Sequence, residues 1–376
     1  MQFCLRMIVL AVCVLLPLSS SLRADENAVL EKAVQWLVDQ QDESGAWKSK
    51  HYGAMKQGAA LTSLALYSLS IAPESIRDKH KDVIDQAFLF LEKGTLARGR
   101  VANPDGSLDH PVYCTSMYLT AAHRFRRKLD AKQVGVLLDF LVRSQCVEGR
   151  GFSPDNPNHG GWDVIGPDVM AGKTSGTNVS VTRYVLEAYS CYVPTNGKTS
   201  LKLDEETVGL VTKSRQHAIK WLERLQKMNT DGGFRFSAQP GTALNKSKTE
   251  DGTPRSYASA TSDGFLALYF GGVDGGEIYD SVLKWQKQNA TAIEVTGFGE
   301  ESSWPDALRY YHLQAMARAA SVSSDVKWAS QINSDVSAYI AQAQREDGRF
   351  ENKSALMRED DPIIATSFAI VALSSQ

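Results

Sequence analysis

The sequence predicts an all-α fold in which six helical hairpins form two concentric rings of helices. Three observations predict it: a recurring glutamine–glycine–aromatic motif, paired helical segments around its copies, and almost no strand-like alternation over 376 residues. The clearest copies of the motif are QDESGAW at residues 41–47 and QREDGRF at residues 344–350. Repeats on this scale are typical of supersecondary units that bury their apolar faces only against neighbouring units.

Each hairpin is expected to pair an outer helix with an inner one. Apolar side chains at helical spacing mark the outer helices, as with Ala33, Trp36 and Leu37 in the first. The expected outer helices cover residues 28–41, 82–92, 131–145, 205–228, 278–289 and 325–344. The expected inner helices cover residues 57–70, 112–125, 178–192, 257–270, 305–320 and 362–374.

Six such pairs could stack as an open superhelix or close into a ring. Both ends of the chain carry full copies of the motif rather than polar capping variants, which favours a ring. The second helix of each pair is rich in small and apolar residues, so we expect it to be buried nearly all round. The motif glycine is expected in the left-handed conformation at a helix end, and the glutamine is expected to bond loop carbonyls or the adjacent helix.

The segment KAVQWLVDQQDESGAW at residues 32–47 resembles the QW repeat of the squalene cyclase and protein prenyltransferase superfamily. Looser copies lie at residues 145–152, 226–234 and 344–350, with a degenerate one at 105–108, so the resemblance covers essentially the whole chain after its first residues. The resemblance implies an α/α toroid of six hairpins. It implies much less about the reaction, because one scaffold hosts many unrelated functions.

The reaction motifs of that superfamily are incomplete in this chain. Its cyclases use an Asp-x-Asp-Asp-Thr-Ala acid, and REDDPI at residues 358–363 keeps only Asp360 and Asp361. Its prenyltransferases hold zinc with an Asp-x-Cys pair and a distant histidine, whereas Asp109, His110 and Cys114 stand at a different spacing. We therefore expect neither a metal site nor a cofactor.

Asp360 and Asp361 are nevertheless the candidate catalytic residues. Two neighbouring carboxylates raise the pKa of one of them and could create a proton donor. The alternative is that Asp361 caps the last helix, with Pro362 at its first position.

Aromatic side chains on the inner helices are candidates for the wall of a central cavity. Such rings stabilise passing cations, which isoprenoid carbocation chemistry requires. The alternative is that they belong to the core. The candidates are Tyr113, Tyr184, Tyr257 and Tyr311, together with the acid Asp263 near the start of an inner helix.

The long loop over residues 146–177 supplies further candidates for ligand contacts, namely His159, Trp162 and Asp163. Long glycine-rich loops in a compact fold are often functional. Equally, GGW at residues 160–162 fits a shifted copy of the glycine–aromatic packing of the repeat.

Residues 1–24 are predicted to be a secretory signal peptide, with Arg6 before an apolar run over residues 7–18 and small residues before Ala24. That run is too short to span a bilayer, and no other stretch is long and apolar enough. We therefore expect residues 25–376 to form one toroid domain that is secreted or periplasmic and has no transmembrane segment. Of the five cysteines, Cys114, Cys146 and Cys191 would remain, either with one disulfide or as buried thiols.

The charge balance argues against nucleic acid as a partner. Without Arg6 and Arg23, 39 basic residues face 43 acidic ones, a net charge of −4, and no basic run is present. Oligomeric state is not predicted.

The leading functional prediction is an exported protein that binds an apolar or isoprenoid-like small molecule in a central cavity. If it is an enzyme, we expect it to resemble the terpenoid cyclases and prenyltransferases. The alternatives are a polysaccharide lyase or glycosidase, because sugar-active enzymes also use α/α toroids, and a non-enzymatic binding or assembly module.

Overall fold

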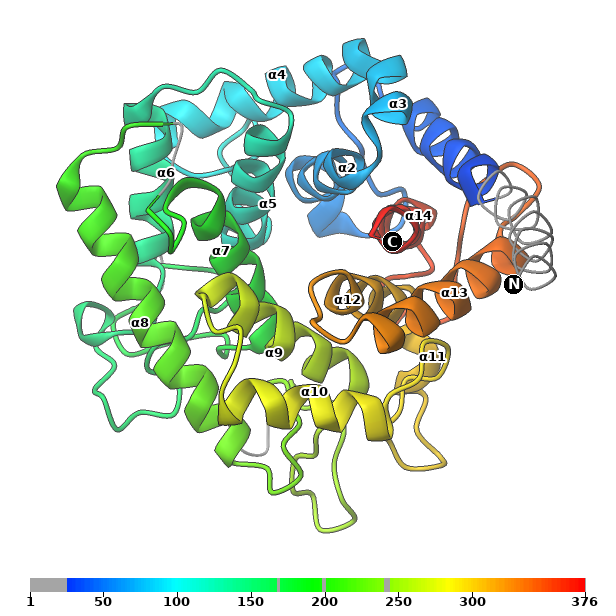
Figure 1. Cartoon of the computed structure of the whole chain (residues 1–376). Helices are drawn as coiled ribbons and strands as arrows, with labels where there is room; N and C mark the ends of the chain where they lie inside the picture. Colours follow the sequence, from blue (N-terminus) through cyan, green and yellow to red (C-terminus); the bar gives the residue numbers. More distant parts are fainter. Residues whose placement is uncertain (1–25, 168–169, 198–200, 240–243, 376) are drawn as a thin grey trace, which may run out of the picture.

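Two concentric rings of helices make up the part of the chain that the computed structural model describes, residues 26–167, 170–197, 201–239 and 244–375 (Figure 1). The predicted signal peptide at residues 1–24 lies outside these ranges. In the described ranges no helix combines the length and the apolar character needed to cross a membrane.

The inner ring is closed, because each inner helix packs against the next and α14 packs against α2. Its members are α2 (Ala59–Ile71), α5 (Pro111–Arg124), α7 (Val179–Tyr192), α9 (Ala258–Gly271), α12 (Arg309–Ser321) and α14 (Pro362–Ser374). The outer ring consists of a helix over residues 26–39, α4 (Lys81–Arg98), α6 (Ala131–Arg143), α8 (Glu205–Lys227), α10 (Glu277–Asn289) and α13 (Val326–Ala343). The predicted all-α toroid of six hairpins is confirmed.

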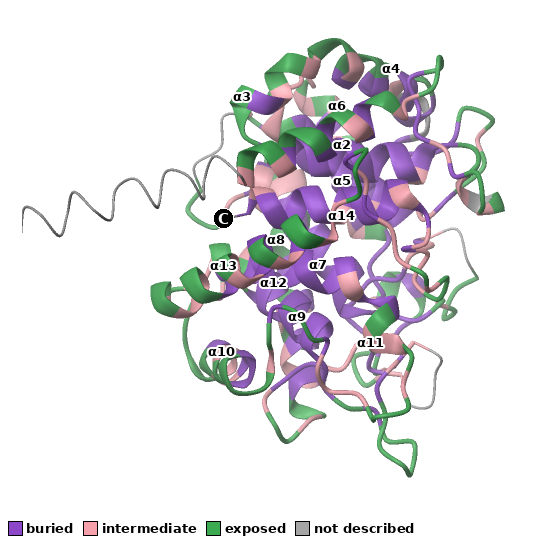
Figure 2. Cartoon of the chain, turned by 90° about the vertical axis from the view of Figure 1, so that its right-hand side faces the viewer, coloured by how far each residue is buried: buried purple, intermediate pink, exposed green. Residues whose placement is uncertain are grey.

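Burial follows the two rings. Inner helices are buried over most of their circumference, whereas outer helices expose one face to solvent (Figure 2). Helices that are apolar all round are stable only where other elements surround them, and a closed inner ring provides that position.

The end of the second outer helix differs clearly from the expected one. α4 continues past residue 92 to Arg98, because the residue that ends it is Gly99 in the left-handed conformation (φ +66°). Short helices that the sequence analysis did not predict lie in the connections: η1 (Gly53–Met55), α3 (Glu74–Arg77), η2 (Asp78–His80) and η3 (Glu148–Arg150).

The fifth inner helix is broken into α11 (Trp304–Ala307) and α12. The backbone N–H groups of Tyr310 and Tyr311 donate to the buried carboxyl group of Glu359 at 3.0 and 2.8 Å. A carboxylate at this position satisfies amides that a helix start leaves open. The segment before α14 therefore caps α12.

Motif glutamines join one hairpin to the next at four of the six junctions. The Nε2 amide of Gln41 donates to Gly45 O of its own motif at 3.1 Å and to Val83 O of α4 at 2.8 Å. The other copies repeat this double bond: Gln145 to Gly160 and Ser214, Gln226 to Gly232 and Ile278, and Gln344 to Gly348 and Val29.

The last of these pairs closes the ring. Gln344 Nε2 donates to Val29 O in the first helix at 2.8 Å. Gly348 has a φ of +97°, and a Cβ atom there would lie 2.5 Å from Lys32 O. The sixth hairpin therefore packs against the first through the same glutamine and glycine contacts that are found at the other motif junctions.

The three cysteines in the described ranges, Cys114, Cys146 and Cys191, are free thiols. Burial raises the pKa of each, which keeps the thiolate form rare and the group unreactive. Of the two possibilities left open by the sequence, the structure has the buried thiols.

We expect Gly348→Ala to destabilise the protein more than Gly252→Ala does. Both glycines have left-handed φ angles, but a Cβ atom at Gly252 would meet nothing within 4 Å. Gly252→Ala should cost about 1–2 kcal/mol of backbone strain. Gly348→Ala adds a collision with the first helix and should lower the free energy of unfolding by about 3 kcal/mol or more.

Urea denaturation of the two variants and the wild type measures this difference. Equal losses in both variants would contradict a tight contact at the closure of the ring.

Candidate functional site

A cavity of about 260 Å³ lies at the centre of the inner ring, among α2, α5, α7, α12 and α14. Its wall is mainly aliphatic and aromatic: Met55, Ala60, Leu61, Leu64, His110, Tyr113, Cys114, Met117, Tyr184, Tyr311, Leu356, Met357, Arg358, Ile364 and Phe368. Met55, His110 and Arg358 belong to the segments that precede inner helices, so these segments surround one end of the cavity. Larger hollows of about 570 and 630 Å³ lie between outer-ring elements, away from the centre.

Hydroxyl groups form a continuous chain from the cavity wall to a buried acid. The Tyr113 hydroxyl donates to Ser180 Oγ at 2.8 Å, and Ser180 is hydrogen-bonded to the Tyr311 hydroxyl. The Tyr311 hydroxyl in turn donates to Asp263 Oδ2 at 2.5 Å. Four inner helices, α5, α7, α9 and α12, each contribute one member to this chain, which we call the hydroxyl relay (Tyr113, Ser180, Tyr311, Asp263).

Asp263 is placed to change its protonation state near neutral pH. Burial raises its pKa to about 6, although Arg183, with Nη1 3.4 Å from Asp263 Oδ1, and Tyr311 act in the opposite direction. A protonated carboxyl is a hydrogen-bond donor. The hydroxyl relay can therefore run either toward Asp263 or away from it.

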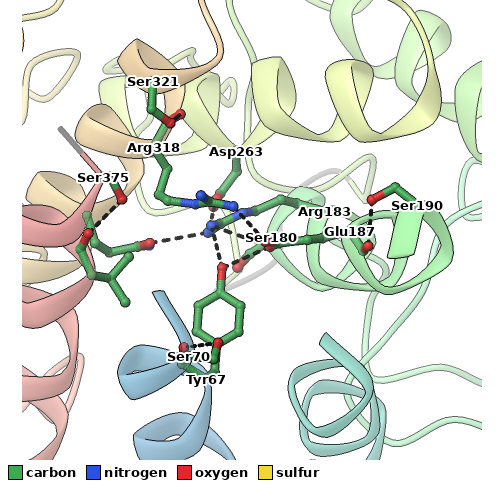
Figure 3. Close-up of polar contacts among 12 residues, drawn as sticks. Tyr67, Ser70, Ser180, Arg183, Glu187, Ser190, Asp263, Arg318, Ser321 and Ser375 are labelled. Carbon is green, nitrogen blue, oxygen red and sulfur yellow. Dashed lines mark hydrogen bonds and ion pairs between the residues drawn. The ribbon is translucent and has the colours of Figure 1, made fainter. Parts of the chain in front are cut away.

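A cluster of buried charges fills the ring beside this relay (Figure 3). Glu187 Oε1 accepts hydrogen bonds from Arg124 Nη2 at 2.8 Å and from Arg318 Nη2 at 2.6 Å, while Tyr67 donates to Oε2 at 2.8 Å. Burial alone would raise the pKa of Glu187, but Arg318, Arg124 and Arg183 lower it overall. Buried ionic groups persist when paired and hydrogen-bonded in this way.

Three of the predicted aromatic residues, Tyr113, Tyr184 and Tyr311, line the cavity. Asp263 lies one hydrogen bond behind the wall. Tyr257 is not part of the wall: its ring is buried against Phe298, with centroids 4.9 Å apart.

Asp360 and Asp361 are not among the residues that line the cavity. Asp361 Oδ1 accepts from Ile363 N at 3.0 Å as the N-cap of α14, which is the alternative role that the sequence left open. Asp360 Oδ1 accepts from the Tyr52 hydroxyl at 2.5 Å. A catalytic role for these two carboxyls stays a prediction.

The three expected contacts in the 146–177 loop also lie outside the cavity wall. Trp162 is fully buried and donates from Nε1 to Leu141 O at 2.7 Å, as Trp47 does to Leu37 O at 2.6 Å. Asp163 accepts from Gly166 N at 2.8 Å and holds the loop. His159 lies near Glu148, with Nε2 3.2 Å from Oε2.

The sequence analysis missed Ser180, Arg183, Glu187 and Glu359. A signal for two of them was present: Arg183 and Glu187 stand four residues apart in a helix that should be buried all round. Charged residues at such positions are rare unless they are paired. Nothing in the sequence distinguished Glu359 from its acidic neighbours, because its partners come from α12.

The chain matches the family model described as the prenyltransferase alpha-alpha toroid domain over residues 5–166 and 184–357, and it belongs to this family. The comparison with curated proteins gives no match.

Solved structures of several activities share the fold. A type II terpene cyclase from Scytonema matches with a TM-score of 0.62 and 9% identity, covering 95% of this chain and 98% of the cyclase. A cellobiose 2-epimerase from Bacillus thermoamylovorans matches with a TM-score of 0.59 and 11% identity, covering 93% and 99%. A glycosidase matches with a TM-score of 0.54 and 12% identity, covering 95% and 98%. At such identities these likenesses show the fold alone.

We expect Asp263→Asn to change how stability depends on pH. Because the folded-state pKa of Asp263 is raised, the folded chain binds a proton between pH 3.8 and about 6 that the unfolded chain has released. The wild type therefore loses stability from this group as pH rises through that window. Asparagine cannot titrate, so the stability of the variant relative to the wild type should rise by up to about 3 kcal/mol between pH 4 and 7.

Asp325→Asn is the matched control, because a hydrogen bond from Lys287 lowers the pKa of that carboxyl and so moves its titration below pH 3.8. Its stability relative to the wild type should therefore stay nearly constant between pH 4 and 7. Urea denaturation at pH 4, 5, 6 and 7 tests both variants, and a constant relative stability of Asp263→Asn over the same range would refute the assignment.

Proposed function

We propose that the chain is an exported protein that binds an apolar, isoprenoid-like ligand in the central cavity. The observation that carries this proposal is the wall of the cavity, where aliphatic, methionine and aromatic side chains predominate. Burying apolar surface there contributes roughly 25 cal/mol per Å². The volume of about 260 Å³ is slightly below the roughly 300–1,000 Å³ of typical ligand sites, which suits one end of an extended chain.

A structural neighbour supports the ligand class by analogy. The type II terpene cyclase from Scytonema has been solved with its substrate geranylgeranyl dihydroxybenzoate, at a TM-score of 0.58 to this chain and 10% identity. Its ligand carries an isoprenoid chain, which is the chemistry that the apolar wall of the present cavity would accept.

We infer further that the hydroxyl relay is the route by which a proton would reach such a ligand. Protonated Asp263 would give its proton to Tyr311, and Ser180 and Tyr113 would each pass one on, so that Tyr113 protonates an alkene carbon and Asp263 becomes a carboxylate. The rings of Tyr113, Tyr184 and Tyr311 would face the resulting carbocation. Asp263 thereby takes the role that the sequence analysis gave to Asp360 and Asp361.

A polar hollow supports the sugar-active alternative. It has a volume of about 460 Å³ and lies beside Trp304, with Asn245, Lys246, Ser247, Glu301 and Ser302 in its wall. Burial lowers the pKa of Lys246 to about 8, and its Nζ lies 5.5 Å from the centre of the Trp304 ring. An aromatic face with polar neighbours suits a sugar, so cellobiose belongs in the binding test.

We expect Leu64→Phe to weaken farnesol binding by about tenfold, equivalent to about 1.4 kcal/mol, because the larger side chain fills the central cavity. Leu210→Phe is the control, since Leu210 lines an outer hollow between α6 and α8. Isothermal titration calorimetry with farnesol and with cellobiose measures both variants. Farnesol binding that responds only to Leu210→Phe, or binding of cellobiose alone, would overturn the proposed ligand class.

Tyr113→Phe should keep ligand binding and abolish proton delivery. The ring stays in the wall, but the hydroxyl at the end of the relay is lost, so conversion of geranylgeraniol should fall by at least about 100-fold. Tyr257→Phe, outside the cavity, should leave the rate unchanged. A wild type that binds geranylgeraniol without converting it would contradict the relay and leave the binding proposal intact.

A further inference from the structure

The third junction of the ring carries an insertion within the repeat motif. Gln41 and Gly45, like Gln344 and Gly348, are four positions apart, whereas Gln145 and Gly160 are fifteen apart. The contacts of the motif persist despite this: Gln145 Nε2 donates to Gly160 O and to Ser214 O, both at 2.8 Å.

The extra residues are looped out from a closed base. Cys146 N donates to Gly161 O at 3.0 Å, and Gly160 N donates to Cys146 O at 2.7 Å. These two hydrogen bonds fix the base of the inserted loop, so its side chains have a defined position beside the neighbouring hairpin.

The insertion brings Glu148 and His159 against His217 of α8. One potential ligand atom from each residue lies within 4.8 Å of the others, and no other such group occurs in the described ranges. The rings of His159 and His217 face each other with centroids 5.3 Å apart. Among the neighbouring positive charges, Arg224 donates from Nη2 to the backbone carbonyl of His159, and its guanidinium is engaged there. Lys213 and Lys220 have exposed side chains, so solvent screens their charges.

Two imidazole nitrogens in this group are buried without a hydrogen bond. His159 is only 8% exposed, and its Nε2 lies 3.2 Å from Glu148 Oε2 but outside hydrogen-bonding geometry. His217 Nδ1 is likewise buried and makes no hydrogen bond. Buried polar atoms in native proteins almost always have a partner, and imidazole nitrogen is the commonest metal ligand.

The other junctions offer no equivalent ligand. The residue whose carbonyl oxygen the motif glycine approaches is His217 at this junction, but Gln86, Ser281 and Lys32 at three others. His217 therefore lies opposite the motif glycine at the one of these four junctions where the insertion also supplies His159 and Glu148.

We propose that Glu148, His159 and His217 bind a divalent transition-metal ion, Zn²⁺ above all, that fastens the inserted loop to α8. Two imidazoles and a carboxylate suit zinc and leave a fourth position for water. Zinc–ligand bonds of about 2.1 Å place tetrahedral ligand atoms about 3.4 Å apart. The three ligand atoms now lie within 4.8 Å of one another, so side-chain rotations that move them by roughly 1 Å would complete the site. The site is separate from the central cavity and does not depend on the ligand proposed there.

Titration of the metal-free chain with Zn²⁺ by calorimetry tests the proposal. We expect one Zn²⁺ per chain, and Co²⁺ should give the intense visible absorption of a four-coordinate ion. His159→Ala and His217→Ala should each weaken Zn²⁺ binding by more than about 100-fold, since even outer partners of a metal site typically contribute 10–100-fold. His80→Ala, on η2, is the matched control and should change nothing.

Glu148→Gln keeps the test decisive if the histidine variants fail to fold, because Glu148 is exposed and its substitution should leave the fold intact. It should keep the circular dichroism spectrum of the wild type, weaken Zn²⁺ binding by at least about tenfold, and remove most of the Zn²⁺-induced rise in melting temperature. Absence of stoichiometric Zn²⁺ binding to the wild type, or binding that survives both histidine substitutions, would overturn the proposal.

Discussion

The double hydrogen bond of the motif glutamine is the interaction on which the rest of the structure depends. A side-chain amide has two N–H donors, and here one bonds the carbonyl of the motif glycine while the other bonds the next outer helix. This bond recurs at four of the six junctions and fixes the position of the neighbouring hairpins there. Between Gln344 and Val29 it joins the two ends and turns a stack of hairpins into a ring.

Closure of the ring decides what its centre can contain. Six inner helices that face one axis leave no solvent for Arg183, Glu187 or Asp263, so these charges must neutralise and bond one another. Where the side chains are apolar instead, the ring retains a cavity. Tyr113 and Tyr311 lie at the boundary, with their rings in the cavity wall and their hydroxyls in the polar relay, so Asp263 lies one hydrogen bond behind the wall.

The junctions also show how the fold accepts variation. Residues 146–159 are added inside a motif without disturbing its glutamine bonds, because the backbone closes the insertion at its base. Insertions of this kind change the chemistry of the surface while the rings stay as they are. The same fold occurs in a terpene cyclase, an epimerase and a glycosidase.

Helix periodicity and the repeated glycine-aromatic motif were sufficient to predict the all-α class and the six hairpins, because these depend on contacts between neighbours in sequence. The glutamine and glycine of each motif could be given structural roles for the same reason. The closed ring depends on a contact between residues 315 positions apart, and it was predicted from the full copies of the motif near both ends of the chain. Tertiary structure alone decided that Asp361 caps α14, that Trp162 is packed as Trp47 is, and that Asp263 meets the hydroxyls. Tyr113, Ser180, Asp263 and Tyr311 come from four different helices, as Glu148 and His217 come from two hairpins. A local sequence pattern does not predict which side chains from distant helices will be in contact at the centre of the ring.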